Sequence, residues 1–105
     1  MFFRFTYLNI PSDKKEEFKK LYTDEVVPVV RAQKGNLSVR LLEPTSENGE
    51  FISVTEWESA DDAGVYESRG TYKSLVDKFK DGLLSPPVLK TYNEVERRVP
   101  TENLF

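Results

Sequence analysis

The sequence predicts a ferredoxin-like α+β fold, in which helices cover one face of a four-stranded antiparallel sheet. Two patterns lead to this prediction. Four short segments, at 2–10, 36–43, 50–57 and 88–96, are rich in aromatic and β-branched residues or alternate between apolar and polar residues, as β-strands do. Apolar residues recur at helical spacing between the first and second segments and between the third and fourth. The order strand, helix, strand, strand, helix, strand is a split β-α-β arrangement, and right-handed crossovers place both helices on the same face.

Length and composition describe one small domain and exclude several classes of function. The 105 residues carry a net charge of −3 and include neither cysteine nor histidine. An acidic chain has no positive field for nucleic acid, and the missing residue types remove thiolate catalysis, sulfur ligands for metals and the usual imidazole base. The apolar start, residues 1–10, is too short for a signal peptide or a membrane span. We therefore expect a cytoplasmic protein that binds neither nucleic acid nor membranes.

The first strand is apolar on both faces, which predicts that both faces of the sheet are covered. The first helix follows Pro11, and Asp13 with Glu16 has the spacing of a capping box. Pro28 falls inside the helical pattern and predicts a kink or break, because proline removes a backbone hydrogen bond. Gly35 then predicts a left-handed cap at the end of the segment.

Asn48-Gly49 is a strong hairpin signal between the second and third strands. In the third strand, Ile52 and Val54 share one face. We predict that this face contacts the helices, because it matches the aliphatic faces of the second strand and the first helix. Trp57 then lies on the opposite face. An apolar face that bears a tryptophan is too large to leave in water, so we expect two copies to pack these sheet faces together as a homodimer.

The second half of the chain begins with another capping signal, Ser59 with Asp62, which starts a helix directly after the tryptophan. Gly70 ends this helix, and a second helical segment runs from Tyr72 to about Leu83, before Pro86-Pro87 and the last strand. We assign residues 1–96 to the domain. Residues 97–105 have no period and are expected to form a C-terminal tail, either disordered or packed over a partner.

Several of these features together resemble the antibiotic biosynthesis monooxygenase (ABM) family over about residues 2–96. They are the Trp57-Glu58-Ser59 turn, Tyr66, Tyr72, the closing Tyr92-Asn93-Glu94-Val95, the opening Phe3-Arg4 strand, and Val27-Pro28 before Gly35. The resemblance implies a dimeric α/β barrel. Characterised members include cofactor-independent oxygenases of quinols and aromatic polyketides, whereas others degrade haem or isomerise small sugar phosphates. The haem-degrading branch uses a histidine that this chain lacks, so we set it aside.

The resemblance also implies a site for a small aromatic ligand, with no metal and no cofactor. Trp57 matches the cavity tryptophan of the family, and Ser53 stands where the polyketide oxygenases carry asparagine. We expect Arg40 to stabilise a phenolate, Trp57 to stack on the ring, and Ser53 and Tyr66 to bind its oxygens. The candidate catalytic residues are Trp57, Arg40 and Tyr66, and the candidate substrate-binding residues are Tyr7, Ser53, Phe51 and Tyr72.

Each candidate also has a purely structural interpretation. Trp57 suits a core position, the tyrosines suit packing positions with an exposed hydroxyl, and Arg40 suits a surface ion pair. The leading hypothesis is therefore a cofactor-independent monooxygenase of a quinol-like or polyketide-like substrate. The alternative is a non-catalytic ABM-like dimeric domain that binds a small ligand. An isomerase or lyase of a small polar metabolite would need a more basic cavity than these residues predict.

Overall fold

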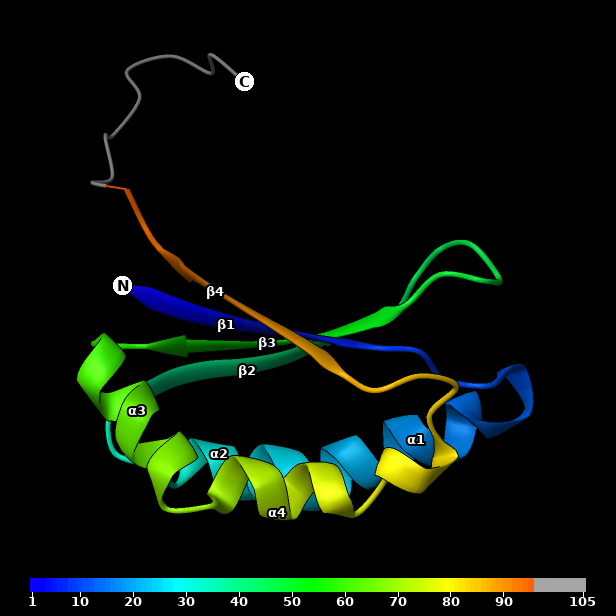
Figure 1. Cartoon of the computed structure of the whole chain (residues 1–105), viewed down its shortest axis with the longest axis horizontal. Coiled ribbons are helices and arrows are strands. Elements are labelled where there is room, and N and C mark those ends of the chain that lie inside the picture. Colours follow the sequence, from blue (N-terminus) through cyan, green and yellow to red (C-terminus); the bar gives the residue numbers. More distant parts are fainter. Residues whose placement is uncertain (96–105) are drawn as a thin grey trace.

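The structure, a computed structural model, describes residues 1–95, and the predicted tail at 97–105 lies outside the described residues. Its four antiparallel strands follow the order β2-β3-β1-β4, and the helices form one layer on a single face of the sheet (Figure 1). The ferredoxin-like prediction is therefore confirmed. The strands are β1 (Phe2–Leu8), β2 (Asn36–Leu42), β3 (Phe51–Trp57) and β4 (Val88–Asn93). The helices are α1 (Lys15–Leu21), α2 (Val27–Arg31), α3 (Ala60–Ser68) and α4 (Thr71–Asp77), with 3-10 turns η1 (Ser12–Lys14) and η3 (Lys80–Gly82) and a π-helical segment η2 (Tyr22–Val26).

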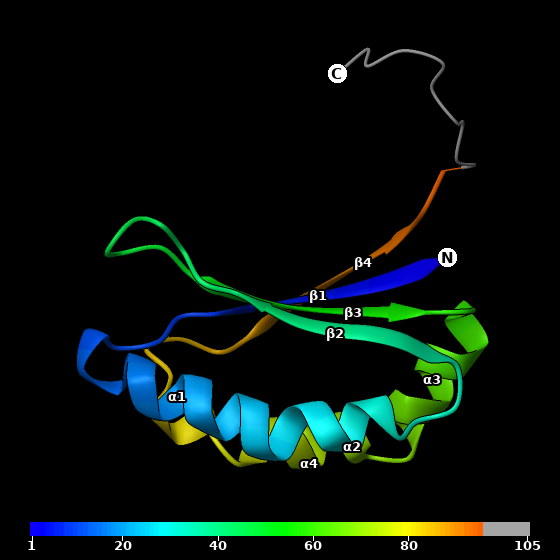
Figure 2. The same cartoon turned by 180° about the vertical axis from the view of Figure 1, so that it is seen from behind.

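The first helical segment changes its winding where proline disturbs it. Figure 2 shows α1, η2 and α2 as one rod beneath β2 and β3. The π turn of η2, in which the Val27 N–H donates to the Tyr22 carbonyl, precedes Pro28 in the first turn of α2. The predicted interruption is thus a π-helical stretch and not a chain break. The predicted capping box at Asp13 was wrong, because η1 begins after Pro11 and Asp13 makes no side-chain cap.

The register of the two central strands determines which side chains face the helices. Strand β1 pairs with β3 so that Arg4 opposes Thr55, Thr6 opposes Ser53 and Leu8 opposes Phe51. Paired residues on adjacent strands share a face, and alternate residues point to opposite faces. The even-numbered residues of β1 and the odd-numbered residues of β3 therefore lie together on the helix-covered face.

The predicted assignment of the two faces of β3 was wrong. Phe51 and Trp57 are fully buried beneath the helices, whereas Ile52 and Val54 lie on the other face, which we call the open face. The helices contribute large side chains to the core, such as Phe18 and Tyr22, and also smaller ones, such as Val30. The fully buried aromatic side chains of the sheet, Phe51 and Trp57, pack against this layer. A homodimer through the tryptophan-bearing face is consequently excluded, because the protein's own helices cover that face.

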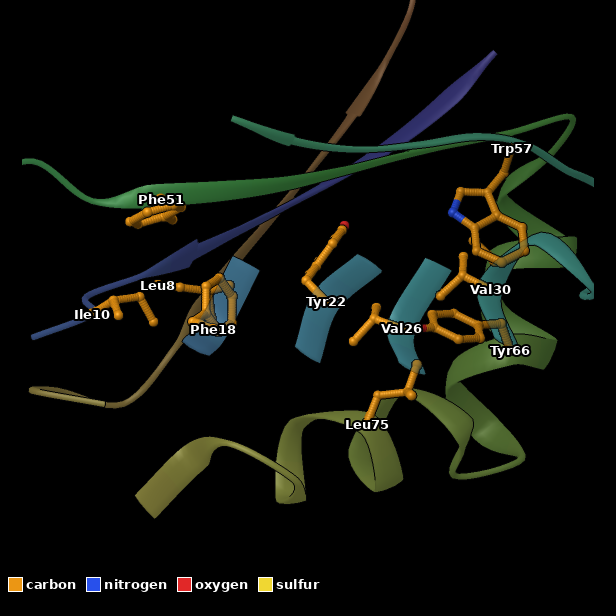
Figure 3. Packing of buried hydrophobic residues seen from close by; sticks show 11 residues of the cluster. Leu8, Ile10, Phe18, Tyr22, Val26, Val30, Phe51, Trp57, Tyr66 and Leu75 are labelled. Atoms are coloured by element: carbon orange, nitrogen blue, oxygen red, sulfur yellow. The ribbon is translucent and has the colours of Figure 1, made fainter. Parts of the chain in front are cut away.

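The core has two aromatic ends with a more polar centre between them (Figure 3). At one end Phe18 contacts Phe51 edge-on, with ring centroids 5.5 Å apart. At the other end Trp57 stacks on Tyr66 at 5.0 Å, and its indole Nε1 donates to the Thr55 hydroxyl at 2.8 Å. Tyr22 lies between these ends, so that the middle of the core contains a hydroxyl instead of a large apolar side chain.

The predicted helix cap at Ser59 and the predicted left-handed turns at Gly35 and Gly70 are confirmed. The Ser59 hydroxyl accepts a hydrogen bond from the Asp62 backbone N–H at 3.1 Å, as an N-cap should. Gly35 and Gly70 adopt left-handed conformations, with φ of 82° and 79°. A side chain on Gly35 would in addition collide with the Asp62 side chain, because the turn after α2 packs tightly against the start of α3.

Gly35→Ala is expected to lower the free energy of unfolding by at least about 2 kcal/mol, because the left-handed strain and the collision with Asp62 act together. Gly70→Ala, which meets only open space, should lose about 1 kcal/mol through backbone strain alone. Gly64→Ala inside α3 should gain about 0.5–1 kcal/mol. Urea unfolding of the three variants measures this order, and equal losses at Gly35 and Gly70 would contradict the close packing.

Candidate functional site

A cavity lies in the polar centre of the core, between the sheet and the helices. Its volume is about 30 Å³, which accommodates about two water molecules. Its walls come from β1, β3, η2, α2, α3, α4 and the turn that follows α4. The lining residues are Arg4, Thr6, Leu8, Tyr22, Val26, Val30, Ser53, Thr55, Tyr66, Tyr72, Leu75, Val76 and Phe79.

Arg4 is the charged residue of this cavity and is only 4% exposed. Its guanidinium lies over two aromatic rings, 4.6 Å from the ring centroid of Tyr72 and 5.5 Å from that of Tyr66. Its carboxylate partner is Glu67, at 3.5 Å and half exposed at the edge of the site. This separation exceeds the 2.7–2.9 Å typical of a strong charge-assisted hydrogen bond. Arg4 is therefore a buried cation whose counter-ion lies at the edge of the site.

Hydroxyl groups also line the cavity that contains Arg4. The Tyr22 and Ser53 hydroxyls are 2.6 Å apart and share a hydrogen bond. Thr6 and Thr55 are also buried on the same face of the sheet. Together these groups can donate hydrogen bonds to the oxygens of a polar or aromatic ligand.

Burial changes the acidity of the two innermost tyrosines. Burial raises the pKa of the Tyr22 hydroxyl, and the hydrogen bond with Ser53 only partly opposes that effect. Burial also raises the pKa of the Tyr66 hydroxyl far above its usual range, against the opposing influence of the Arg4 guanidinium. Both hydroxyls remain neutral at physiological pH, so they serve as hydrogen-bond donors and not as bases.

Three of the sequence-predicted site residues, Ser53, Tyr66 and Tyr72, lie in the cavity wall. Trp57 lies behind Tyr66 and supports its ring instead of lining the cavity. Phe51 packs against Phe18 at the distant end of the core.

Arg40 and Tyr7 lie on the open face and do not reach the cavity. Arg40 is an exposed residue of β2 that opposes Val54, and only its backbone carbonyl approaches the Tyr22 hydroxyl, at 3.4 Å. Tyr7 contacts Lys90 of β4, whose ammonium lies 5.2 Å from the ring centroid. The predicted role of Arg40 as the anion-binding residue of the cavity is therefore wrong, since its side chain points to the opposite side of the sheet.

Sequence reasoning missed Arg4 and Tyr22 as central residues of the site. A signal for Arg4 was present, because it is the only charged residue in a largely apolar first strand. Its face could not be chosen without knowing that it pairs with Thr55. Tyr22 looked like one member of an apolar helical stripe, and nothing in its spacing indicated that its hydroxyl meets Ser53.

The described part of the chain has neither a cluster of metal-binding side chains nor a membrane-spanning helix. Among residues 1–95, no three histidine, cysteine, aspartate or glutamate side chains are arranged to hold a metal ion. In the same range, no helix is both long enough and apolar enough to cross a bilayer.

Comparison with known proteins identifies a family and several similar folds. The family model described as antibiotic biosynthesis monooxygenase matches residues 1–78. No curated protein sequence matches the chain. The fold is similar to that of a candidate antibiotic biosynthesis monooxygenase from Deinococcus radiodurans, with a TM-score of 0.80 and 14% identity over 97% of this chain and 100% of the other.

Two further structures show the same likeness. A monooxygenase from Streptomyces coelicolor in complex with nanaomycin D has a TM-score of 0.78 and 17% identity, over 95% of this chain and 92% of the other. A candidate antibiotic biosynthesis monooxygenase from Nitrosomonas europaea has a TM-score of 0.75 and 20% identity, over 90% of this chain and 99% of the other. At these identities the likeness establishes the fold.

Stability should fall at alkaline pH because of the buried tyrosines. Their pKa values are raised in the folded state above the value of about 10 for an exposed tyrosine. Their contribution to stability is therefore complete below about pH 10 and is lost as the pH rises towards the folded-state values. Urea unfolding of Tyr66→Phe should show a decline above pH 10 that is about 1 kcal/mol per pH unit shallower than in the native protein. Equal slopes would show that Tyr66 ionises as readily in the folded as in the unfolded chain.

Proposed function

The chain belongs to the antibiotic biosynthesis monooxygenase family, and on that premise we propose that it oxygenates a small electron-rich phenol or hydroquinone without a metal or an organic cofactor. The observation that carries the proposal is Arg4, a buried cation that faces a cavity of neutral hydroxyls between the sheet and the helices. A phenolate is a flat anion, and such a cavity offers it one positive charge, aromatic walls and hydrogen-bond donors.

In the proposed reaction the substrate is its own reductant. Bound as the phenolate, it transfers electrons to dioxygen, one oxygen atom enters the ring as a carbonyl, and the other leaves as water. A phenol and dioxygen thus give a quinone and water, with no external reductant. The Arg4 guanidinium stabilises the anion, and the carboxylate of Glu67, which pairs with Arg4, is the base available to accept the phenol proton.

The cavity as it stands is too small for an aromatic substrate, and substrate binding must enlarge it. A volume of about 30 Å³ is too small for an aromatic ring. The rings of Tyr66 and Tyr72 form the wall on the side of α3 and α4 and are the parts that must move. The sequence contains no histidine to act as a base, and this favours a second candidate function, a non-catalytic domain that binds a small ligand.

Oxygen consumption separates these two functions. Incubation with a panel of hydroquinones and anthrones should produce oxygen uptake and quinone absorbance. Arg4→Gln should lower kcat/KM by at least about 100-fold, because a preorganised charge at the developing anion is lost. Arg40→Gln removes the same type of charge from the open face and should retain activity within about twofold. Oxygen uptake that is absent across the panel, or unaffected by Arg4→Gln, would overturn the proposal.

We also propose that a second copy of the chain covers the open face. This face carries apolar side chains on all four strands, and in the described chain no helix covers it (Figure 1). Phe3, Phe5, Tyr7 and Tyr92 line a shallow hollow of about 290 Å³ on it. Phe5 and Tyr92 meet edge-on, with centroids 5.2 Å apart. Apolar patches of this extent are characteristic of interfaces, and a matching face on a second chain supplies an apolar cover of the same shape.

Sedimentation velocity tests the proposed dimer. The native protein should sediment as a dimer, and Phe5→Lys should shift it to a monomer, because a charge would be buried at the centre of the interface. Leu84→Lys is a matched control, since Leu84 is 65% exposed and lies outside the sheet. A native monomer at micromolar concentration, or a Phe5→Lys variant that stays dimeric, would contradict the proposal.

A further inference from the structure

A second hollow lies outside the cavity, on the far side of Tyr66. This outer cleft has a volume of about 270 Å³ and lies between α3 and the turn that follows α2. Its lining residues are Gln33, Lys34, Asp62, Val65, Tyr66 and Arg69. Tyr66 also lines the inner cavity, and its ring points inward from α3 beneath Trp57 (Figure 3). Tyr66 therefore lies between a small inner cavity and a larger outer cleft, and displacement of its side chain would join them.

The outer cleft carries an excess of positive charge. Lys34 and Arg69 are exposed, and neither side chain has an ion-pair partner within residues 1–95. The single carboxylate of the cleft, Asp62, accepts a hydrogen bond from the Ser59 hydroxyl at the start of α3. Arg4 lies on the inner side of the same tyrosine, 5.5 Å from its ring centroid. Cationic groups therefore lie on both sides of Tyr66.

A groove at the other end of the helices has a different charge balance. This groove, of about 230 Å³, adjoins the cavity at Phe79 and contains Lys14 and Lys78. Both lysines already have carboxylate partners, Glu17 at 3.6 Å and Glu25 at 3.4 Å. An anionic group in this groove would have to displace those partners. The outer cleft at Tyr66 is thus the better site for an anion that extends from the cavity.

We propose that the outer cleft binds an anionic substituent of the substrate, so that the substrate is a hydroxyarene with a carboxylate on the side remote from its reacting hydroxyl. This inference rests on the proposed function, which places the hydroxyl beside Arg4. The ring takes the position that the Tyr66 side chain vacates, and Lys34 and Arg69 bind the carboxylate. Contacts at both ends would hold the ring between Arg4 and the outer cleft.

Two probes of the same ring system test the charge requirement. Isothermal titration calorimetry at pH 7 and low ionic strength compares 2-naphthol with 6-hydroxy-2-naphthoic acid, which adds a carboxylate opposite the hydroxyl. The native protein should bind the acid about fivefold more tightly, the gain expected for a partly exposed charge pair. Added salt should reduce this preference, because it screens exposed charges.

Two double variants show which residues cause the preference for 6-hydroxy-2-naphthoic acid. Lys34→Gln with Arg69→Gln should bind the two probes equally well and leave the affinity for 2-naphthol unchanged. Lys14→Gln with Lys78→Gln removes the same charge from the other groove and should keep the preference. The inference is overturned if the native protein does not prefer the acid, if neither probe binds, or if the preference survives in the first variant or disappears in the second.

The same samples distinguish this inference from the proposed reaction. A preference for the acid that depends on Lys34 and Arg69, without oxygen uptake from any phenol, would reject the oxygenase and leave the anion site supported. Oxygen uptake without any preference for the acid would reject the anion site alone.

Discussion

The pairing of β1 with β3 is the constraint on which the rest of this structure depends. Side chains alternate between the two faces of a strand, so a slip of one residue would exchange every inward and outward side chain. The observed register places Arg4 beside Thr55 and Thr6 beside Ser53 under the helices. It places Phe3, Phe5 and Tyr7 on the open face. Both the polar centre of the core and the apolar outer surface follow from this single alignment.

A buried arginine is costly, and the surrounding residues show how the fold tolerates it. Transfer of a charge from water into a protein interior costs several kcal/mol unless partners compensate. Here the compensation comes from the rings of Tyr66 and Tyr72 and from Glu67 at the edge. The rings attract the cation through their negatively charged faces and also form one wall of the cavity. In the proposed site, a ligand beside Arg4 would therefore displace the rings that stabilise it.

Trp57 packs against Tyr66 on the side of the ring away from the cavity. Its indole stacks on Tyr66, and its N–H is satisfied by Thr55, so it fixes the position of the tyrosine without entering the cavity. Tyr66 in turn stands between the inner cavity and the outer cleft. In the proposed site, the Trp57–Tyr66 stack therefore contributes both to core packing and to the barrier that a ligand must displace.

The sequence by itself determined the order and type of the elements, the cap at Ser59 and the left-handed turns at Gly35 and Gly70. These features depend on local backbone preferences and on periodicity, and both can be recognised from residues that are close together in the sequence. Such reasoning could not decide which face of β3 lies against the helices, because both faces are apolar enough to be buried. The choice between Arg4 and Arg40 had the same difficulty, since each is a lone charge in an apolar strand. Only the tertiary structure decided them, because strand pairing and the volume beneath the helices involve residues that lie far apart along the chain.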